Sequence, residues 1–469
     1  MIRFDDVPPT AGRDCTAALL HAAAQRAVNY LETIPERRVF PSQEQVGELA
    51  KLGGPLPELP ESPADVLALL DQVGSPATVA ITGGRYFGFV SGGALPATVA
   101  ANWLAAAWDQ NACLRVLSPV AAQLEDITLA WLLELFQLPP GCAGAFVTGA
   151  QTATFTSLAA ARHAVLARCG WDVEANGLFG APPIEVIVGD EVHATVLKAL
   201  AMLGLGRDRV KRVPCDRQGR MRADSIPPCE VPTIICTQAG NVNTGSFDPV
   251  QEIRELTRGG NVWVHVDSAF GLWATVLPEL RELTKGVEIA DSWGVDAHKW
   301  LNVPHDSGIA IVREPSHLHA AMTISAPYLA QGNAREPMQW GPESTRRARA
   351  IEIWTALRTL GRAGVAELVR RCCRHALAFA NGLRAAGFEI LNEVELNQVL
   401  VAFGDDTTTA RVIEGIQREG TCWCGGTTWH GRKAMRISVS SWATTESDVE
   451  RSLSAMLRVA REINQGAEL

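Results

Sequence analysis

The sequence has no long hydrophobic run and no surplus of positive charge. None of its apolar stretches approaches the roughly 18 consecutive residues of a membrane-spanning helix. Residues 1–10 carry charge and two prolines where a signal peptide needs an apolar segment. The formal net charge of −9 argues against a general affinity for nucleic acid, because such binding needs a basic face. We therefore expect a cytoplasmic protein that binds neither membranes nor nucleic acid.

The cysteines form neither a disulfide framework nor a zinc motif. They number 11, an odd count scattered over 469 residues, which favours reduced thiols. Cys372-Cys373 and Cys422-x-Cys424 are candidate metal ligands, with His430 nearby, but a second set at zinc spacing is missing. We therefore expect buried or half-buried thiols and no metal. The 47% hydrophobic and 20% charged residues are typical of a globular protein.

From about residue 146, short apolar runs alternate with helical stretches. This alternation predicts the α/β class, with a mostly parallel central sheet covered by helices on both faces. Ligands of such sheets bind beyond the carboxyl ends of the strands. The predicted strands are 185–188, 233–236, 262–266, 292–295 and 309–312, and predicted helices between them include 194–203 and 249–257.

The chain divides into three predicted parts. Residues 1–80 form a helical segment interrupted by proline-rich linkers, and residues 81–340 form the large domain. Residues 341–469 form a small α+β C-terminal domain. It begins with a long helix from about Ser344 to Thr359. In this last part we expect strands at 398–403 and 434–439 and helices at 407–419 and 446–464. Ser62-Pro63 and Ser118-Pro119 are typical helix starts, with serine as the cap and proline first in the helix.

Two charged residues, 32 positions apart, end apolar strands. Asp267 ends the run Trp263–Val266, and Lys299 stands between His298 and Trp300. Burial beside other charge lowers the pKa of a lysine and makes its amine a nucleophile towards carbonyls. Taken alone, the aspartate can equally cap the next helix or fold a turn.

Two further segments complete a set of chemical groups. Residues 145–154 predict a strand and a small-residue turn, and a helical run from Phe155 to Arg168 follows. Such a turn and helix N-terminus can bind phosphate. His193 follows another strand, where its ring can lie flat on a planar ligand or can simply cap a helix. An amine, an acid, an aromatic ring and a phosphate cradle at strand ends are what pyridoxal 5′-phosphate (PLP) requires. Lys299 would form the Schiff base and Asp267 would keep the pyridine nitrogen protonated.

The sequence resembles the group II PLP-dependent amino-acid decarboxylases, which include aromatic amino-acid, glutamate and tyrosine decarboxylases. The resemblance runs from about Tyr86 to the C-terminus. It implies PLP fold type I, like aspartate aminotransferase, and a homodimer with active sites at the interface and residues 1–80 as the dimer arm. The motifs that carry it are Tyr86-Phe87-Gly88-Phe89, Ser118-Pro119 with Leu124-Glu125, His193, Val266–Ala269, Asp296–Trp300, and Arg346–Arg349 with Trp354.

The resemblance also implies roles for single residues. Lys299 is the Schiff-base lysine, Asp267 pairs with the pyridinium and His193 stacks on the ring. The substrate is an amino acid, with a preference for an aromatic or bulky apolar one. The remaining assignments are Ala150, Gln151 and His298 on the phosphate, Ala269 against the ring, Asn241 near the cofactor hydroxyl, and Tyr86, Phe87 and Phe89 in the substrate pocket or, equally, in the core.

One departure from the family leaves the reaction open. Its decarboxylases commonly carry a tyrosine on a mobile loop, which protonates the α-carbon, but the matching residues 329–340 contain none. His193, His305 or Tyr328 would then deliver the proton, or the reaction differs. The first hypothesis is a decarboxylase that forms an amine and carbon dioxide. The alternatives are an aldehyde synthase or C–C lyase on the same scaffold, and a PLP-fold protein that only binds.

Overall fold

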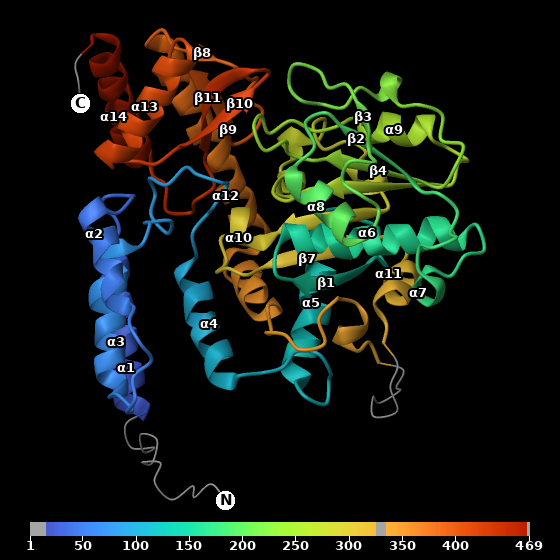
Figure 1. Cartoon of the computed structure of the whole chain (residues 1–469), viewed down its shortest axis with the longest axis horizontal. Helices are drawn as coiled ribbons and strands as arrows, with labels where there is room; N and C mark the ends of the chain where they lie inside the picture. Colours follow the sequence, from blue (N-terminus) through green and yellow to red (C-terminus); the bar gives the residue numbers. More distant parts are fainter. Residues whose placement is uncertain (1–15, 325–333, 467–469) are drawn as a thin grey trace, which may run out of the picture.

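The computed structural model describes residues 16–324 and 334–466. It confirms the α/β class and the mostly parallel central sheet (Figure 1). The strand order is β1-β7-β6-β5-β4-β2-β3, and only β7 runs antiparallel to its neighbours. The strands are β1 (Ala143–Val147), β2 (Glu185–Gly189), β3 (Lys211–Val213), β4 (Thr233–Gln238), β5 (Val262–Asp267), β6 (Ser292–Asp296) and β7 (Gly308–Val312).

A smaller antiparallel sheet, in the order β10-β11-β9-β8, lies in the C-terminal part of the chain. Its strands are β8 (Glu389–Ile390), β9 (Gln398–Ala402), β10 (Gly425–Trp429) and β11 (Arg432–Ser438). The helices are α1 (Thr16–Thr33), α2 (Gln43–Glu48), α3 (Pro63–Leu69), α4 (Pro96–Trp108), α5 (Pro119–Leu135), α6 (Ala150–Ala167), α7 (Val173–Asn176), α8 (Ala194–Met202), α9 (Val250–Leu256), α10 (Ala297–Trp300), α11 (Pro315–Met322), α12 (Ala350–Ala385), α13 (Asp406–Glu419) and α14 (Glu446–Asn464). Among the described residues, none of the helices has both the length and the apolar character needed to cross a membrane.

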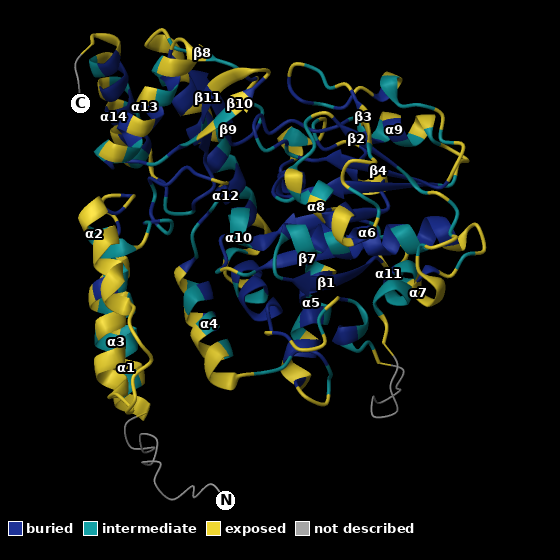
Figure 2. Ribbon diagram, in the orientation of Figure 1, coloured by how far each residue is buried: buried dark blue, intermediate teal, exposed yellow. Residues whose placement is uncertain are grey.

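Helices cover both faces of the large sheet because its strands are apolar on both sides. Successive residues of β2 enter different cores: Ile187 packs in the core shared with α5 and α12, whereas Val186 and Val188 pack in the core shared with α6 and α8. The other central strands alternate in the same way, as expected where successive side chains point to opposite faces. The sheet is therefore a rigid platform buried on both sides (Figure 2).

Two predicted helix boundaries are wrong. The helix predicted from Ser344 begins at Ala350 and continues to Ala385, with non-helical backbone only at Gly361. Before Ala350 the backbone directs arginines to buried or half-buried acids: Arg346 bonds to Glu125 at 2.5 Å. These ion pairs outweigh the helical preference of the segment. The helix after β1 begins at Ala150, immediately after its N-cap Gly149, instead of at Phe155.

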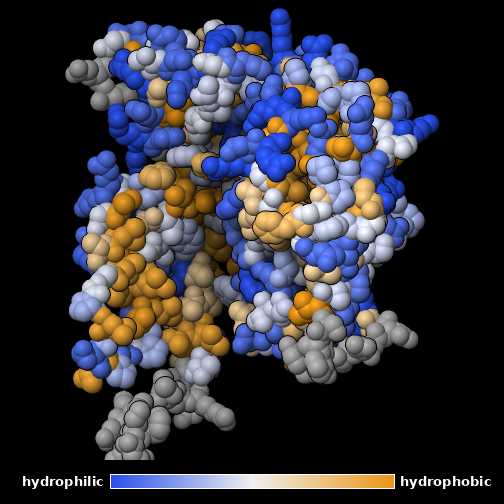
Figure 3. Space-filling model, turned by 45° about the vertical axis from the view of Figure 1, so that its right-hand side comes forward, coloured by the Kyte–Doolittle hydropathy of each residue, from blue (hydrophilic) through white to orange (hydrophobic). Residues whose placement is uncertain are grey.

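The N-terminal helices lie at one side of the molecule (Figure 1). They leave apolar side chains exposed to solvent. Helix α1 has no buried residue, and Leu20 is 60% exposed. Helix α4 beside it exposes Trp103, Leu104 and Trp108. Figure 3 shows hydrophobic residues gathered over this side of the molecule. Contiguous apolar surface of this kind is typical of a protein interface.

Candidate active site

A cavity of about 250 Å³ lies at the carboxyl ends of the central strands. This is the position that the topology predicts for a ligand site. Most of the predicted site residues meet here, although they come from distant parts of the chain. The cavity is lined by Gly149, Ala150, Gln151, His193, Thr195, Gln238, Gly240, Val242, Asp267, Ala269, Phe270, Asp296, His298 and Lys299.

Lys299 enters the cavity from the short helix α10, directly after β6. Its side chain is 19% exposed, and its Nζ lies 3.2 Å from Oδ2 of Asp296 and 6.0 Å from the ring centre of Phe270. The other oxygen of Asp296, Oδ1, accepts a hydrogen bond of 2.5 Å from the amide of Ala150. A buried carboxylate therefore orients the lysine amine and joins it to the first turn of α6.

The sequence analysis assigns no role to Asp296, although this residue begins the motif Asp296–Trp300. A signal was available, because it ends β6 as Asp267 ends β5. Both carboxylates belong to adjacent parallel strands, so their side chains reach the same edge of the sheet.

Asp267 and His193 lie on the same cavity. Asp267 is 7% exposed, and its Oδ1 accepts a hydrogen bond of 3.3 Å from the amide of Ala269. His193 caps α8, and its Nδ1 lies 2.7 Å from the hydroxyl of Thr195, which holds the ring in one orientation. Burial lowers the pKa of His193, and the charge of Asp267 opposes that shift. The imidazole therefore favours its neutral form.

The predicted phosphate cradle is the N-terminus of α6. The amides of a first helical turn have no acceptor within the helix, so they are free to bind an anion. The amide of Ala150 is already taken by Asp296, so in this arrangement the phosphate would depend on the amides that follow. His298 lies beside this turn, with its Nδ1 3.1 Å from the carbonyl of Ser307. Since a carbonyl only accepts, Nδ1 is the protonated nitrogen.

His298 predicts an acid-sensitive fold for the cofactor-free protein. Burial lowers the pKa of His298 to about 4, so the folded protein leaves it neutral while an unfolded chain protonates it near pH 6.5. Protonation between these values favours the unfolded state, so stability falls as the pH drops from about 6.5 to about 4. We expect a loss of up to about 3 kcal/mol from this residue, measured by urea unfolding at a series of pH values.

The variant His298→Gln should make that pH dependence less steep, because glutamine can donate to Ser307 but does not titrate. Part of the dependence should stay, since burial also lowers the pKa of His265, to about 3. His430→Asn is the control, since His430 is exposed and asparagine also tolerates its positive φ of 47°. Equal acid sensitivity of the His298→Gln variant and the parent protein would contradict the prediction.

Two predicted contacts do not line the cavity. The Oδ1 of Asn241 accepts hydrogen bonds from the amides of Asn243 (2.9 Å) and Thr244 (3.2 Å). Its side chain thus folds its own loop, and the neighbours Gly240 and Val242 line the cavity instead. Phe87 is 1% exposed and packs edge-on against Phe379, which supports the alternative that it belongs to the core.

Tyr86 and Phe89 form a stack with Trp423 outside the cavity. The ring of Trp423 lies 5.2 Å from Tyr86 and 5.6 Å from Phe89, in near-parallel planes. Tyr86 is 6% exposed, whereas Phe89 is 63% exposed. Neither residue lines the 250 Å³ cavity, and their role towards a substrate stays a prediction.

Arg436 on β11 is a residue that the sequence analysis missed. Its half-buried guanidinium has no hydrogen bond or ion pair within residues 16–324 and 334–466. Burial lowers its pKa, and the pKa values of both Tyr86 and His193 are affected by its charge. An arginine between the apolar residues Met435 and Ile437 of a predicted strand was the available signal.

The arrangement fits PLP. The aldehyde has an amine in Lys299, the ring nitrogen has a carboxylate in Asp267, and the phosphate has a helix N-terminus. The flat ring has the imidazole of His193 and the small side chain of Ala269 among the lining residues. Fold and cavity together define a PLP-dependent enzyme of fold type I.

Comparison with known proteins agrees with this class. Residues 57–404 match the family model described as the pyridoxal-dependent decarboxylase conserved domain. The chain is 28% identical to aromatic-L-amino-acid decarboxylase of Cavia porcellus over 79% of this chain and 82% of the relative. It is 27% identical to L-2,4-diaminobutyrate decarboxylase of Rhizobium meliloti over 87% of this chain and 85% of the relative.

A solved structure described as Oryza sativa TDC with PLP and tryptamine superimposes with a TM-score of 0.89. The superposition covers 97% of this chain and 99% of that one at 22% identity, so it shows the fold alone. The family match spans most of the chain. The protein therefore belongs to the pyridoxal-dependent decarboxylase family.

Proposed function

We propose that the protein decarboxylates an aromatic or bulky apolar L-amino acid to an amine and carbon dioxide. Its family membership supports a PLP-dependent amino-acid decarboxylase, and the absence of a basic cluster for a second carboxylate in the sequence supports an apolar substrate side chain. Bound PLP supplies an electron sink for the charge that remains on the α-carbon when the carboxylate leaves. The observation that supports this most is the pairing of the Lys299 amine with Asp296 in the cavity that also holds Asp267.

The roles of the residues follow from their positions. Lys299 holds the cofactor through its Nζ, which Asp296 orients at 3.2 Å. Asp267 keeps a proton on the ring nitrogen, since a buried carboxylate stabilises a positive charge beside it. His193 covers one face of the ring and excludes water from it. The first turn of α6 and His298 bind the phosphate.

We propose that Arg436, whose charge acts on the pKa of His193 although it does not line the 250 Å³ cavity, binds the carboxylate of the substrate. Its desolvated charge has no protein counter-ion in the described part of the chain, and a guanidinium matches a carboxylate in geometry. We expect Arg436→Met to raise KM by about 10- to 100-fold, a typical loss for one charge-assisted contact. Initial rates over a range of substrate concentrations measure this effect.

Arg432→Met is the matched control, because Arg432 lies on the same strand and pairs with Glu389 at the surface. Its KM should stay unchanged. An unaltered KM in the Arg436→Met variant would rule out the proposed contact.

A substrate panel tests the proposed function. The holoenzyme is incubated with aromatic, branched, acidic and basic L-amino acids, and carbon dioxide and amine are measured together. We expect equal amounts of both from an aromatic or bulky apolar substrate. No carbon dioxide from any member would contradict decarboxylation, and turnover of acidic or basic amino acids alone would contradict the substrate class.

Aldehyde synthesis is a second candidate, favoured by the absence of tyrosine from residues 329–340. Tyr328 and residues 329–333 lie outside the described residues. His305, a second candidate proton donor, is exposed and stacks 4.1 Å from His298. In this alternative the amino acid, dioxygen and water give an aldehyde, carbon dioxide, ammonia and hydrogen peroxide. Peroxide and aldehyde in place of amine, in the same panel, would identify it.

We also propose a homodimer with its active sites at the interface. Residues 1–80 would be its arm, residues 81–340 the large domain and residues 341–469 the small one. The exposed apolar surface of α1 and α4 supports this assembly. The described cysteines are all free, which supports a reducing, cytoplasmic location. Light scattering should give twice the mass of one chain. The double variant Trp103→Glu/Leu104→Glu should give the mass of a single chain.

A further inference from the structure

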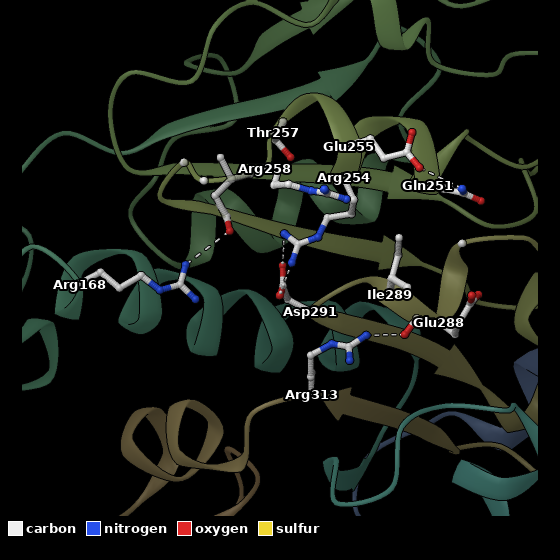
Figure 4. A pocket seen from close by; sticks show the side chains of 14 residues that line it. Arg168, Gln251, Arg254, Glu255, Thr257, Arg258, Glu288, Ile289, Asp291 and Arg313 are labelled. Carbon is white, nitrogen blue, oxygen red and sulfur yellow. Dashed lines mark hydrogen bonds and ion pairs between the residues drawn. The ribbon is translucent and has the colours of Figure 1, made fainter.

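A second cavity, of about 740 Å³, lies at the opposite edge of the large sheet from Lys299. Figure 4 shows the side chains that line it. It opens where β5 and β6 begin, whereas the catalytic cavity lies where they end. Its volume is within the range of small-molecule sites. Four arginines line it: Arg168 after α6, Arg254 and Arg258 at the end of α9, and Arg313 after β7.

One of these guanidinium groups, that of Arg254, pairs with a buried carboxylate, and two more act on it at longer range. Asp291 is 8% exposed, and Arg254 contacts both of its oxygens, at 3.1 and 3.2 Å. Burial raises the pKa of Asp291, and the charges of Arg254, Arg168 and Arg313 each oppose that shift. Asp291 also accepts a hydrogen bond of 2.7 Å from the amide of Val264. Its oxygens are therefore satisfied by Arg254 and the backbone, and it neutralises only one of the three charges.

The remaining arginines are oriented but not neutralised. Arg168 donates to Oδ1 of Asn261 at 3.3 Å, and Arg313 donates to the carbonyl of Ala290 at 2.8 Å. Carbonyl oxygens hold a guanidinium in place but leave its charge uncompensated. Arg258 is exposed and forms no hydrogen bond or ion pair with any described residue. The cavity thus holds two guanidinium groups, those of Arg168 and Arg313, whose directions are set by neutral acceptors, and a third, that of Arg258, which no described residue holds.

Two acids at the cavity do not cancel this charge. Glu255 and Glu288 are exposed, and neither forms an ion pair with the four arginines among the described residues. The carboxylate of Glu255 accepts from Gln251 at 3.0 Å. Helix ends explain the positions of Arg168 and Arg254, because cations stabilise helix C-termini. Arg313 follows a strand, but it donates to the carbonyls of Glu288 and Ala290 at the end of the 3-10 helix η8 (Val287–Ile289), so it also satisfies a helix end.

We propose that this cavity binds a small phosphate-bearing anion through Arg168, Arg258 and Arg313. Arginine forks match phosphate oxygens, and several guanidinium groups without a carboxylate partner suit an anion with more than one charge. The site goes beyond the proposed catalytic function and does not depend on it, because the two cavities share no lining residue.

Calorimetric titration of the PLP-loaded enzyme with inorganic pyrophosphate, at constant ionic strength, tests the proposal. Loading matters because PLP occupies the other phosphate site of the protein. We expect one saturable site per chain, with a Kd below about 1 mM. The double variant Arg168→Ala/Arg258→Ala should bind pyrophosphate with a Kd at least about tenfold higher. Both side chains are exposed, so the variant should fold.

The control variant Arg362→Ala/Arg384→Ala removes two exposed arginines elsewhere, on α12, and should bind like the parent protein. Three results would overturn the proposal: no saturable heat, equal affinity in the double variant, or heat that accompanies release of PLP. The last would mean that pyrophosphate acts at the catalytic cavity. Cofactor absorbance, recorded in parallel, separates this case from the others.

Discussion

Replacing Lys299 with alanine should reduce decarboxylation by at least about a thousand-fold, because it removes the amine that holds the cofactor. The expected loss is large since Lys299 is the lysine that lines the cavity, with Asp296 3.2 Å from its Nζ. Rates are measured with saturating PLP and substrate.

A covalent assay checks the same prediction without relying on activity. After borohydride reduction of the parent protein, the peptide that contains Lys299 should carry the mass of the cofactor. Lys198→Ala is the matched control, because Lys198 is exposed on α8 in the same part of the chain. An adduct on another lysine, or none at all, would contradict both the site and the proposed function.

Replacing Asp267 with asparagine should lower kcat by at least about a hundred-fold, the second-largest effect. Asparagine keeps the size of the side chain and can still accept the bond from the amide of Ala269. It cannot hold a proton on the ring nitrogen by its charge, so the ring withdraws electrons less strongly. The kcat and the visible spectrum of the bound cofactor are the measurements.

Asp190→Asn serves as the control, since Asp190 follows β2 at the same edge of the sheet but is exposed. It should retain the kcat of the parent protein. A cofactor analogue methylated at the ring nitrogen carries a permanent positive charge, and it should partly restore the Asp267→Asn variant. Retention of most of the activity by that variant would show that Asp267 has a structural role only.

Local patterns predicted the strands and several helices well. The helix predicted at residues 446–464 has those bounds, because Thr445 and Asp448 form a capping box at its start. Asp267 and Lys299 were found in the same way, since an apolar strand followed by a small-residue turn places the next polar group at the sheet edge. Such signals depend on neighbours within a few positions and are visible in one sequence.

Contacts between distant segments could not be predicted from these local patterns. Asn241 stands in the right loop, but its hydrogen bonds to Asn243 and Thr244 turn it away from the cavity. The bond of Asp296 to Ala150 joins two strand ends that only the order of the sheet brings together. Phe87 lies in a loop, and it is in the core because Phe379 of α12 packs against it.

The sequence was thus sufficient for the chemical class, since a lysine, an aspartate and a histidine at the ends of strands already indicate PLP. The folded chain was needed to learn which side chains face the cavity, which serve as their orienting partners, and where unpaired charge collects. Arg436 and the arginines around Asp291 illustrate this, because their charge matters through burial and missing partners. Burial and partnership depend on packing between remote segments, which spacing along the chain does not encode.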